Sequence, residues 1–281
     1  TEGASYYNSL QVSFEKHYSG GLNFLGTYTY SNTRSDAGDL LNGGSQGNYR
    51  CPYCPGFGIQ GDYQNANFDI RNVFHFSGGY ELPFGKGKKY LSGVTGVSNV
   101  LVSGWSTQWI ATIEGGQPLN IPCNTYAVNG SQTCNSLLTG QNPYAGPHNV
   151  NQWLNPAAFT QPCVLGDTGP IAGDPVGCVP VTGYGLLGGA PAQLRGPGIS
   201  RLDLSFFKQF HLSERWQMQF RAEFFNILNH PTFNAPGFGG NGVTAIAGST
   251  NFLNSNFGKI GSTRFPFSDP RQIQFALKVF F

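Results

Sequence analysis

The feature of this chain that most constrains its fold is an alternation of apolar and polar residues, repeated in seven long segments. Successive side chains of a β-strand point to opposite faces of a sheet, so this alternation predicts strands with two chemically different faces. The closing stretch RQIQFALKVFF is the clearest case. We expect strands at about 6–18, 22–31, 68–82, 101–113, 202–212, 216–228 and 271–281, and no helix of useful length.

The lengths of these strands point to a membrane. Each is roughly 10 to 15 residues, whereas soluble strands average about 5 or 6 and a bilayer-crossing strand needs about 9 to 11. Short connections alternate with long ones over 33–66, 115–197 and 230–270. Short periplasmic turns and long extracellular loops are typical of outer-membrane barrels. The sequence therefore predicts an all-β fold, a transmembrane antiparallel β-barrel with three long extracellular loops.

The charged residues support the same interpretation, because nearly all fall on the polar parity. The residues that we predict to line a wet lumen are Asp69, Arg71, His75, Glu81, Asp203, Arg221 and Glu223. Lys16, Lys208 and Arg271 fall on the apolar parity. A lipid-facing Lys costs roughly 2 to 4 kcal/mol at the bilayer midplane and near 0 to 1 at the interface. We therefore expect Lys208 to snorkel towards the turn at 213–215.

Composition excludes several other classes of protein. A formal net charge of +2 with scattered basic residues gives no footprint for nucleic acid. No window approaches the roughly 18 apolar residues of a transmembrane helix. The first ten residues do not resemble a signal peptide, so we expect a cytoplasmic protein or a mature or truncated piece.

An odd number of strands also needs explaining, because backbone groups in hydrocarbon must all be paired and bacterial barrels have even strand counts. We therefore expect residues 1–281 to be the C-terminal part of a larger barrel, which would aggregate if expressed alone because both sheet edges would be exposed.

Cysteines in Gly/Pro/Asn-rich, polar loops suggest an oxidising compartment. The six cysteines form three local pairs, Cys51 with Cys54, Cys123 with Cys134, and Cys163 with Cys178. Local pairing of the last two pairs needs the fewest assumptions among 15 possible connectivities. Free thiols remain an alternative, whereas zinc binding by CPYC would require two further ligands that the sequence does not supply at the usual spacing. We expect no metal and no cofactor.

Several other motifs have structural explanations that outweigh functional ones. FGKGKK (84–89) lacks the spacing of a phosphate loop and is interpreted as a basic turn. His75 shares a face with two charged residues but with no placed nucleophile, and the lone His230 lacks further ligands, so we expect no enzyme. Aromatic residues could stack on a sugar-like solute, but we assign them mainly to membrane-interface girdles. The girdle candidates are Tyr28, Tyr30, Trp109, Phe210 and Trp216.

Five stretches together resemble a known family. They are GYELPFGKGKKY (79–90), NPAAF (155–159), LRGPGISRLDLSFFKQF (194–210), FRAEFFNILNHPTFNAP (220–236) and RQIQFALKVFF (271–281). This combination is similar to the barrel end of TonB-dependent receptors, specifically the Oar-like group with a carboxypeptidase-regulatory-like domain. The resemblance implies a 22-stranded barrel, of which these are the last seven strands, and a TonB complex that acts through an N-terminal plug absent from this sequence.

The interpretation as an outer-membrane barrel also gives the C-terminus a role. An alternating tail that ends in Phe is what the barrel-assembly machinery of the outer membrane reads in such proteins. The signal residues would be Ile273, Phe275, Leu277, Val279 and Phe281.

We therefore expect an outer-membrane receptor that binds a large solute and imports it through a polar lumen, with loop 115–197 contacting or gating the solute. A structural or adhesive barrel without transport is the main alternative. A secreted β-sandwich would leave the long two-faced strands unexplained, and an enzyme barrel would need a catalytic constellation that the sequence does not show.

Overall fold

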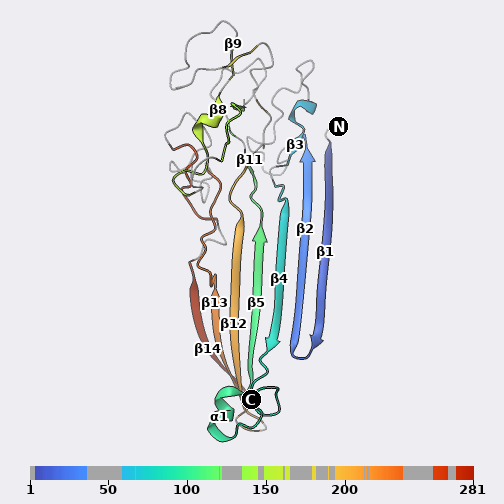
Figure 1. The fold of residues 1–281 in the computed structure, drawn as a ribbon, viewed down its shortest axis with the longest axis vertical. Helices are drawn as coiled ribbons and strands as arrows, with labels where there is room; N and C mark the ends of the chain where they lie inside the picture. Colours follow the sequence, from blue (N-terminus) through green and yellow to red (C-terminus); the bar gives the residue numbers. More distant parts are fainter. Residues whose placement is uncertain are drawn as a thin grey trace.

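The dominant element of the protein is one antiparallel sheet of eight strands, in the order β1-β2-β4-β5-β12-β13-β14, with β3 paired to the end of β2 (Figure 1). The computed structural model describes residues 4–36, 59–66, 68–119, 121, 135–144, 149–160, 162–164, 179–181, 189, 194–211, 213, 215–236, 256–264 and 270–281. Each long strand pairs with the next one along the chain, so the sheet is a succession of hairpins.

The seven predicted strands are confirmed. They are β1 (Ser5–Ser19), β2 (Leu22–Ser35), β4 (Asn72–Glu81), β5 (Trp105–Glu114), β12 (Ile199–His211), β13 (Gln217–Phe225) and β14 (Gln272–Phe280). Five boundaries differ by three or four residues from the sequence-based expectation: β2 ends later, β12 begins earlier, β13 ends earlier, and β4 and β5 begin later. Residues 68–71 lie outside β4, and a short helix, α1 (Gly96–Val102), occupies the first residues of the segment predicted as the fourth strand. β3 (Gln64–Asn65) is a two-residue addition.

The register gives the sheet one apolar and one polar face. Leu204 of β12 is opposite Trp109 of β5 and Phe224 of β13, and all three lie on one face. The next residue, Ser205, is opposite Gln108 and Glu223 on the other face. The apolar face is the outer one, because Gln108, Ser205 and Glu223 of the polar face line the hollow on the concave side of the sheet. On the last strand the apolar side chains are largely uncovered, as Phe275 is at 66%.

Aromatic rings cover two glycines on the apolar face. A Cβ atom at Gly26 would lie 2.0 Å from the ring of Phe14, and one at Gly78 would lie 2.5 Å from the ring of Trp109. Phe76 stands between them, with its ring centroid 6.2 Å from Phe14 and 5.8 Å from Trp109. Cross-strand aromatic packing over small residues stabilises a sheet and fixes its register.

The two ends of the sheet differ. The links between β1 and β2, β4 and β5, and β12 and β13 lie at the end that carries α1 and the C-terminus, which we call the turn end (Figure 1). The start of β1 and the described parts of the three longer connections lie at the other end, the loop end. Gly20 and Gly21 adopt positive φ values of 62° and 82°, which the tight link between β1 and β2 requires.

The connections at the loop end contain short elements and their own core. The elements are η1 (Ile59–Asp62), β6 (Pro118–Leu119), β7 (Leu137–Leu138), η2 (Pro156–Ala158), β8 (Phe159–Thr160), β9 (Pro162–Val164), β10 (Val179–Val181) and β11 (Leu194–Arg195). We call the described residues 117–196 and 232–264 the loop cap. Its core is formed by Leu119, Ile121, Leu154, Ala158, Phe159, Leu194 and Phe257. The loop cap is therefore folded with its apolar side chains inside, as a water-soluble unit is.

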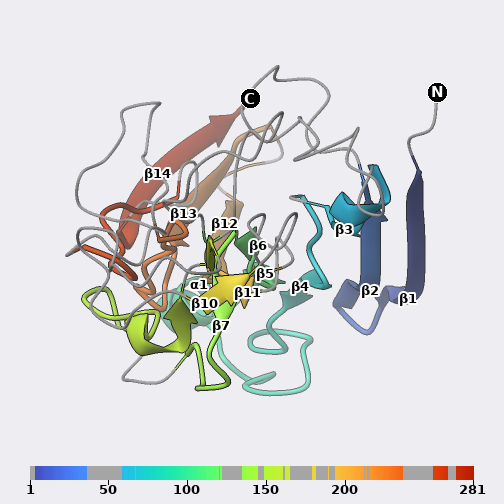
Figure 2. The same cartoon turned by 90° about the horizontal axis from the view of Figure 1, so that it is seen from above.

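The sheet is curved but not closed. Seen along the strands, it bends round from β1 to β14 (Figure 2). Within the described residues, β1 and β14 each have a pairing partner on one side. No helix in the described part of the chain has the length and apolar character needed to cross a bilayer.

Candidate functional site

The concave, polar face of the sheet forms a trough of about 880 Å³. Side chains from six of the seven long strands line it, among them Glu15, Asn23, Ser77, Gln108, Asp203, Ser205, Gln209, Gln219, Arg221 and Glu223. Carboxylate, guanidinium, hydroxyl and amide groups are therefore spread over six strands, interspersed with the apolar side chains of Leu25, Ile110, Phe207 and Phe225. Such a lining suits water and polar solutes, because it offers donors and acceptors of both kinds.

Local partners hold the charged groups of this face. The guanidinium of Arg201 donates to both oxygens of Asp203, at 3.0 and 3.2 Å, and Asp203 also accepts the backbone N–H of Asn226 at 2.8 Å. Arg221 donates to the amide oxygen of Gln219 at 2.7 Å. These pairs fix the side chains in place while leaving a mixed-charge surface.

The predicted lumen residues fall into two groups. His75, Glu81, Asp203, Arg221 and Glu223 lie in β4, β12 and β13 on the polar face, as the register requires. His75 lies 3.4 Å from the hydroxyl of Thr112 on the neighbouring strand. Their lining of a closed lumen stays a prediction.

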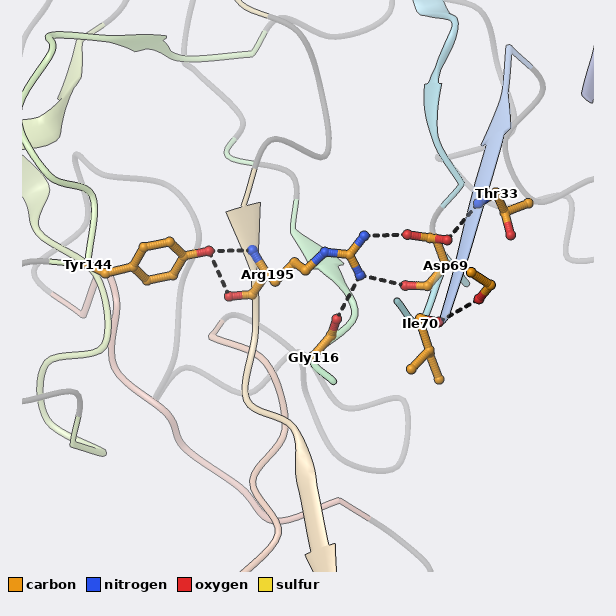
Figure 3. Close-up of polar contacts among 7 residues, drawn as sticks. Thr33, Asp69, Ile70, Gly116, Tyr144 and Arg195 are labelled. Carbon is orange, nitrogen blue, oxygen red and sulfur yellow. Dashed lines mark hydrogen bonds and ion pairs between the residues drawn. The ribbon is translucent and has the colours of Figure 1, made fainter. Parts of the chain in front are cut away.

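The other two predicted residues, Asp69 and Arg71, precede β4 and belong to the loop-end rim. Asp69 is buried and forms an ion pair with Arg195, which is 126 residues further along the chain. The carboxylate of Asp69 also accepts the backbone N–H of Thr33 at 2.7 Å. We call this pair and its partners the rim clasp (Figure 3).

Arg195 makes the rim clasp a junction of several strands. Its guanidinium donates to the backbone oxygens of Asp69 and Gly116, at 3.0 and 3.1 Å. Thr33 belongs to β2, Asp69 precedes β4, Gly116 follows β5, and Arg195 precedes β12 (Figure 3). Arg195 thus bonds directly to the residues next to β4 and β5, and Asp69 extends the connection to β2, so the pair joins four neighbouring strands at the loop end.

Tyr144 connects the rim clasp to the loop cap. Its hydroxyl donates to the backbone oxygen of Arg195 at 3.1 Å and accepts the backbone N–H of the same residue at 2.6 Å. Burial raises the pKa of Tyr144, and the hydrogen bond from Arg195 partly offsets this rise. Sequence reasoning missed Tyr144 and Arg195, although Arg195 lies in the family-like stretch 194–210.

A second junction lies where β13 ends. Asn226 and Asn229 adopt positive φ values of 49° and 50°, which Asn tolerates better than most residues. The buried side chain of Asn226 donates to the backbone oxygen of His230 and accepts its N–H, both at 3.1 Å. The NILNH sequence therefore forms a turn, with His230 contributing backbone groups to it.

The aromatic girdle candidates all lie on or next to the apolar face, at different depths. Tyr28 and Tyr30 are towards the loop end, where the hydroxyl of Tyr28 donates to Asn72 at 2.8 Å. Phe210 and Trp216 are at the turn end. Trp109 is in the middle of β5, because its ring covers Gly78.

The C-terminal signal candidates Ile273, Phe275, Leu277 and Val279 share the apolar face of β14. Phe281 follows the strand, is 93% exposed, and has its ring 5.6 Å from that of Trp216.

The side chains of the cysteines lie outside the described residues; the backbone of Cys163 is in β9, opposite Pro180. No described group of three His, Cys, Asp or Glu side chains is placed to hold a metal ion.

An antiparallel sheet of this length, apolar outside and polar on its concave side, defines the class of membrane β-barrel proteins. Comparison with known families makes the assignment specific. A family described as outer membrane beta barrel domain matches residues 1–274, and the chain belongs to this family. The protein is therefore located in the outer membrane. Neither the curated proteins nor the solved structures gave a match to this chain.

Proposed function

We propose that this barrel is part of a TonB-dependent receptor, which binds a large polar solute with the loop cap and imports it along the concave face of the sheet. The observation that carries the proposal is the polar trough, which extends across the sheet on the side away from lipid. The resemblance of the five sequence stretches to the Oar-like group supports the same function.

In this proposal every step is non-covalent. The solute first contacts the loop cap, and the rim clasp holds the cap against the strands during capture. Within the trough, groups such as Glu223, Arg221 and Gln219 exchange hydrogen bonds with the solute and replace the water that it loses. The protein acts as a transporter and not as an enzyme, with no cofactor.

Energy would come from outside the barrel. A TonB complex would act on a plug supplied by another part of the protein, and movement of the plug would open the path along the trough. The dimensions support passage across the membrane. A ten-residue strand such as β4 is about 33 Å long and covers about 25 Å when tilted by about 40°, the height of an outer-membrane apolar band.

Uptake measurements test this function. Cells with the full-length protein would be compared with a deletion strain for growth on single polymeric or complexed nutrients, and uptake of each affected nutrient would then be measured with a labelled sample. We expect uptake to stop when the TonB complex is inactivated, while binding at the cell surface persists. If deletion changes attachment of cells but no nutrient uptake, the structural or adhesive alternative is correct.

We also propose that the barrel-assembly machinery recognises the last strand. Phe281 and Phe280 provide a matched pair, because Phe281 ends the apolar parity whereas Phe280 is opposite Gln217 on the polar face. We expect Phe281→Ala to lower the amount of heat-modifiable protein in the outer membrane more than Phe280→Ala. Equal losses would contradict the proposed recognition.

A further inference from the structure

Lys208 is a cation on the apolar face of the sheet. It is opposite Trp105 of β5 and Phe220 of β13, and the residue is only 2% exposed. Its ammonium group lies 5.7 Å from the ring centroid of Trp105 and 5.2 Å from that of Phe210. Among the described residues, Lys208 has neither a hydrogen bond nor an ion pair. The aromatic rings therefore partly stabilise a charge whose donors have no acceptor in the sheet.

The position of Lys208 along the strand indicates where an acceptor could come from. Trp105 is the first residue of β5, so Lys208 is level with the turn end of the sheet. In a strand that crosses the outer membrane, the end of the strand lies at the membrane interface, where Lys side chains meet lipid headgroups. A phosphate group at that depth would approach the ammonium from the lipid side, past the rings of Trp105 and Phe210, because the residue is only 2% exposed.

The connection between β4 and β5, residues 82–104, lies beyond the strands at the turn end (Figure 1). It exposes the apolar side chains of Leu91, Val97, Val100 and Leu101. The indole N–H of Trp105 donates to the backbone oxygen of Leu101 at 2.8 Å, so α1 is fastened to the apolar face. A short amphipathic segment with exposed apolar residues at a membrane edge is suited to lie in the interface plane.

Charge at the turn end complements an anionic headgroup. The 82–104 connection carries Lys86, Lys88 and Lys89, and the link between β12 and β13 carries Arg215. Lys88 is engaged by Glu81, at 3.2 Å. Lys86, Lys89 and Arg215 add positive charge to the turn end, where Lys208 also lies.

We propose that Lys208, flanked by Trp105 and Phe210, binds the phosphate of an anionic phospholipid in the membrane leaflet next to the turn end. The 82–104 connection lies over the same lipid, with its apolar side chains among the upper acyl carbons and its lysines near the headgroups. This site is independent of solute transport, since it is on the opposite face of the sheet from the trough.

Lys278 provides a matched control. It is also a Lys beside an aromatic ring, with its ammonium 4.7 Å from the ring centroid of Phe280, but it is opposite Gln219 on the polar face. Lys208→Met and Lys278→Met therefore remove the same group from the two faces of the sheet. Met keeps the length of the side chain and suits a lipid-facing position.

The test uses the full-length protein in nanodiscs that contain phosphatidylcholine and a small fraction of phosphatidylglycerol. Native mass spectrometry of the released protein measures which lipids remain bound. We expect Lys208→Met to lower the apparent affinity for phosphatidylglycerol by about fivefold, the effect of one interfacial lysine. Lys278→Met should leave it unchanged. Unchanged retention in Lys208→Met, or equal losses in both variants, would overturn the proposal.

A second measurement serves if Lys208→Met fails to fold. Tryptophan fluorescence of the unmodified protein would be quenched with brominated phosphatidylglycerol or brominated phosphatidylcholine at equal fractions. A lipid site beside Trp105 predicts stronger quenching by the anionic lipid. Equal quenching by the two lipids would show that the turn end has no preference for an anionic headgroup, and would equally overturn the proposal.

Discussion

Two adjacent residues in β12 test whether the sheet has one lipid face and one water face. Ser205 is the central residue of this 13-residue strand, and Phe206 follows it. Phe206 is opposite Ala222 on the apolar face, with its ring centroid 6.1 Å from that of Phe224. Ser205 is opposite Glu223 on the polar face. Phe206→Arg and Ser205→Arg therefore place the same charge at the same depth on opposite sides.

The expected effects differ widely. A lipid-facing Arg near the midplane costs about 2 to 4 kcal/mol, so Phe206→Arg should lower the folding equilibrium constant by roughly 30-fold to 700-fold. Loss of the ring contact with Phe224 adds about 0.5 to 1.5 kcal/mol, which Phe206→Ala measures separately. Ser205→Arg should be nearly neutral, because water solvates the new charge and Glu223 can pair with it for about 0.2 to 1 kcal/mol.

The assay is urea-dependent unfolding of the full-length protein from lipid vesicles, followed by heat-modifiable gel mobility. Phe206→Arg should shift the midpoint to markedly lower urea, and Ser205→Arg should leave it close to that of the unmodified protein. The reverse order would mean that the polar parity is the buried one, which would refute the two-sided assignment.

The rim clasp and Tyr144 give two further predictions. Arg195→Met leaves the buried carboxylate of Asp69 without its counter-charge, and should lower the free energy of unfolding by about 3 to 5 kcal/mol. Asp69→Asn keeps the contact with Thr33 and should lower it by about 1 to 3 kcal/mol. Thermal unfolding measures both, and a smaller cost for Arg195→Met would contradict the assigned roles. Burial raises the pKa of Tyr144, so folding favours its protonated hydroxyl. The stability that this hydroxyl contributes is complete below about pH 10, the pKa in the unfolded chain, and is lost as the pH rises through the folded-state pKa. Protease resistance of the loop cap should therefore fall above about pH 10 in the unmodified protein; the same fall in Tyr144→Phe would show that another group is responsible.

The strands could be predicted because their cause is local. Alternation along a single segment identifies β1, β12 or β14 without knowledge of any partner. The prediction for β4 began too early because Phe68 and Asp69 continue the alternation, although the distant Arg195 holds Asp69 in the rim. The helix α1 was missed because seven residues are too few for a helical period to appear.

The loop cap could not be predicted for a different reason. Leu119, Leu154, Leu194 and Phe257 come from four separate segments, none of which has a regular apolar pattern. These four segments meet because the strands hold their ends close together, so the cap core can form only after the sheet. The Lys208 position, by contrast, was identified from its parity, and the structure adds the two aromatic rings beside it.

The loop cap and the strands place their apolar side chains in opposite ways. The cap has them inside, whereas the sheet has them on its outer face. Phe159 is 2% exposed in the cap, whereas Phe275 of β14 faces outward and is 66% exposed. Transfer from bilayer to plain buffer should therefore act first on the strands, and the cap, whose segments the strands bring together, should follow. A harsh detergent that enters apolar cores should act first on the cap. The effect of substitutions should differ in the same way between the strands and the cap. In the strands, replacing an exposed Phe with a polar residue should destabilise the protein, whereas replacing it with another apolar residue should have little effect.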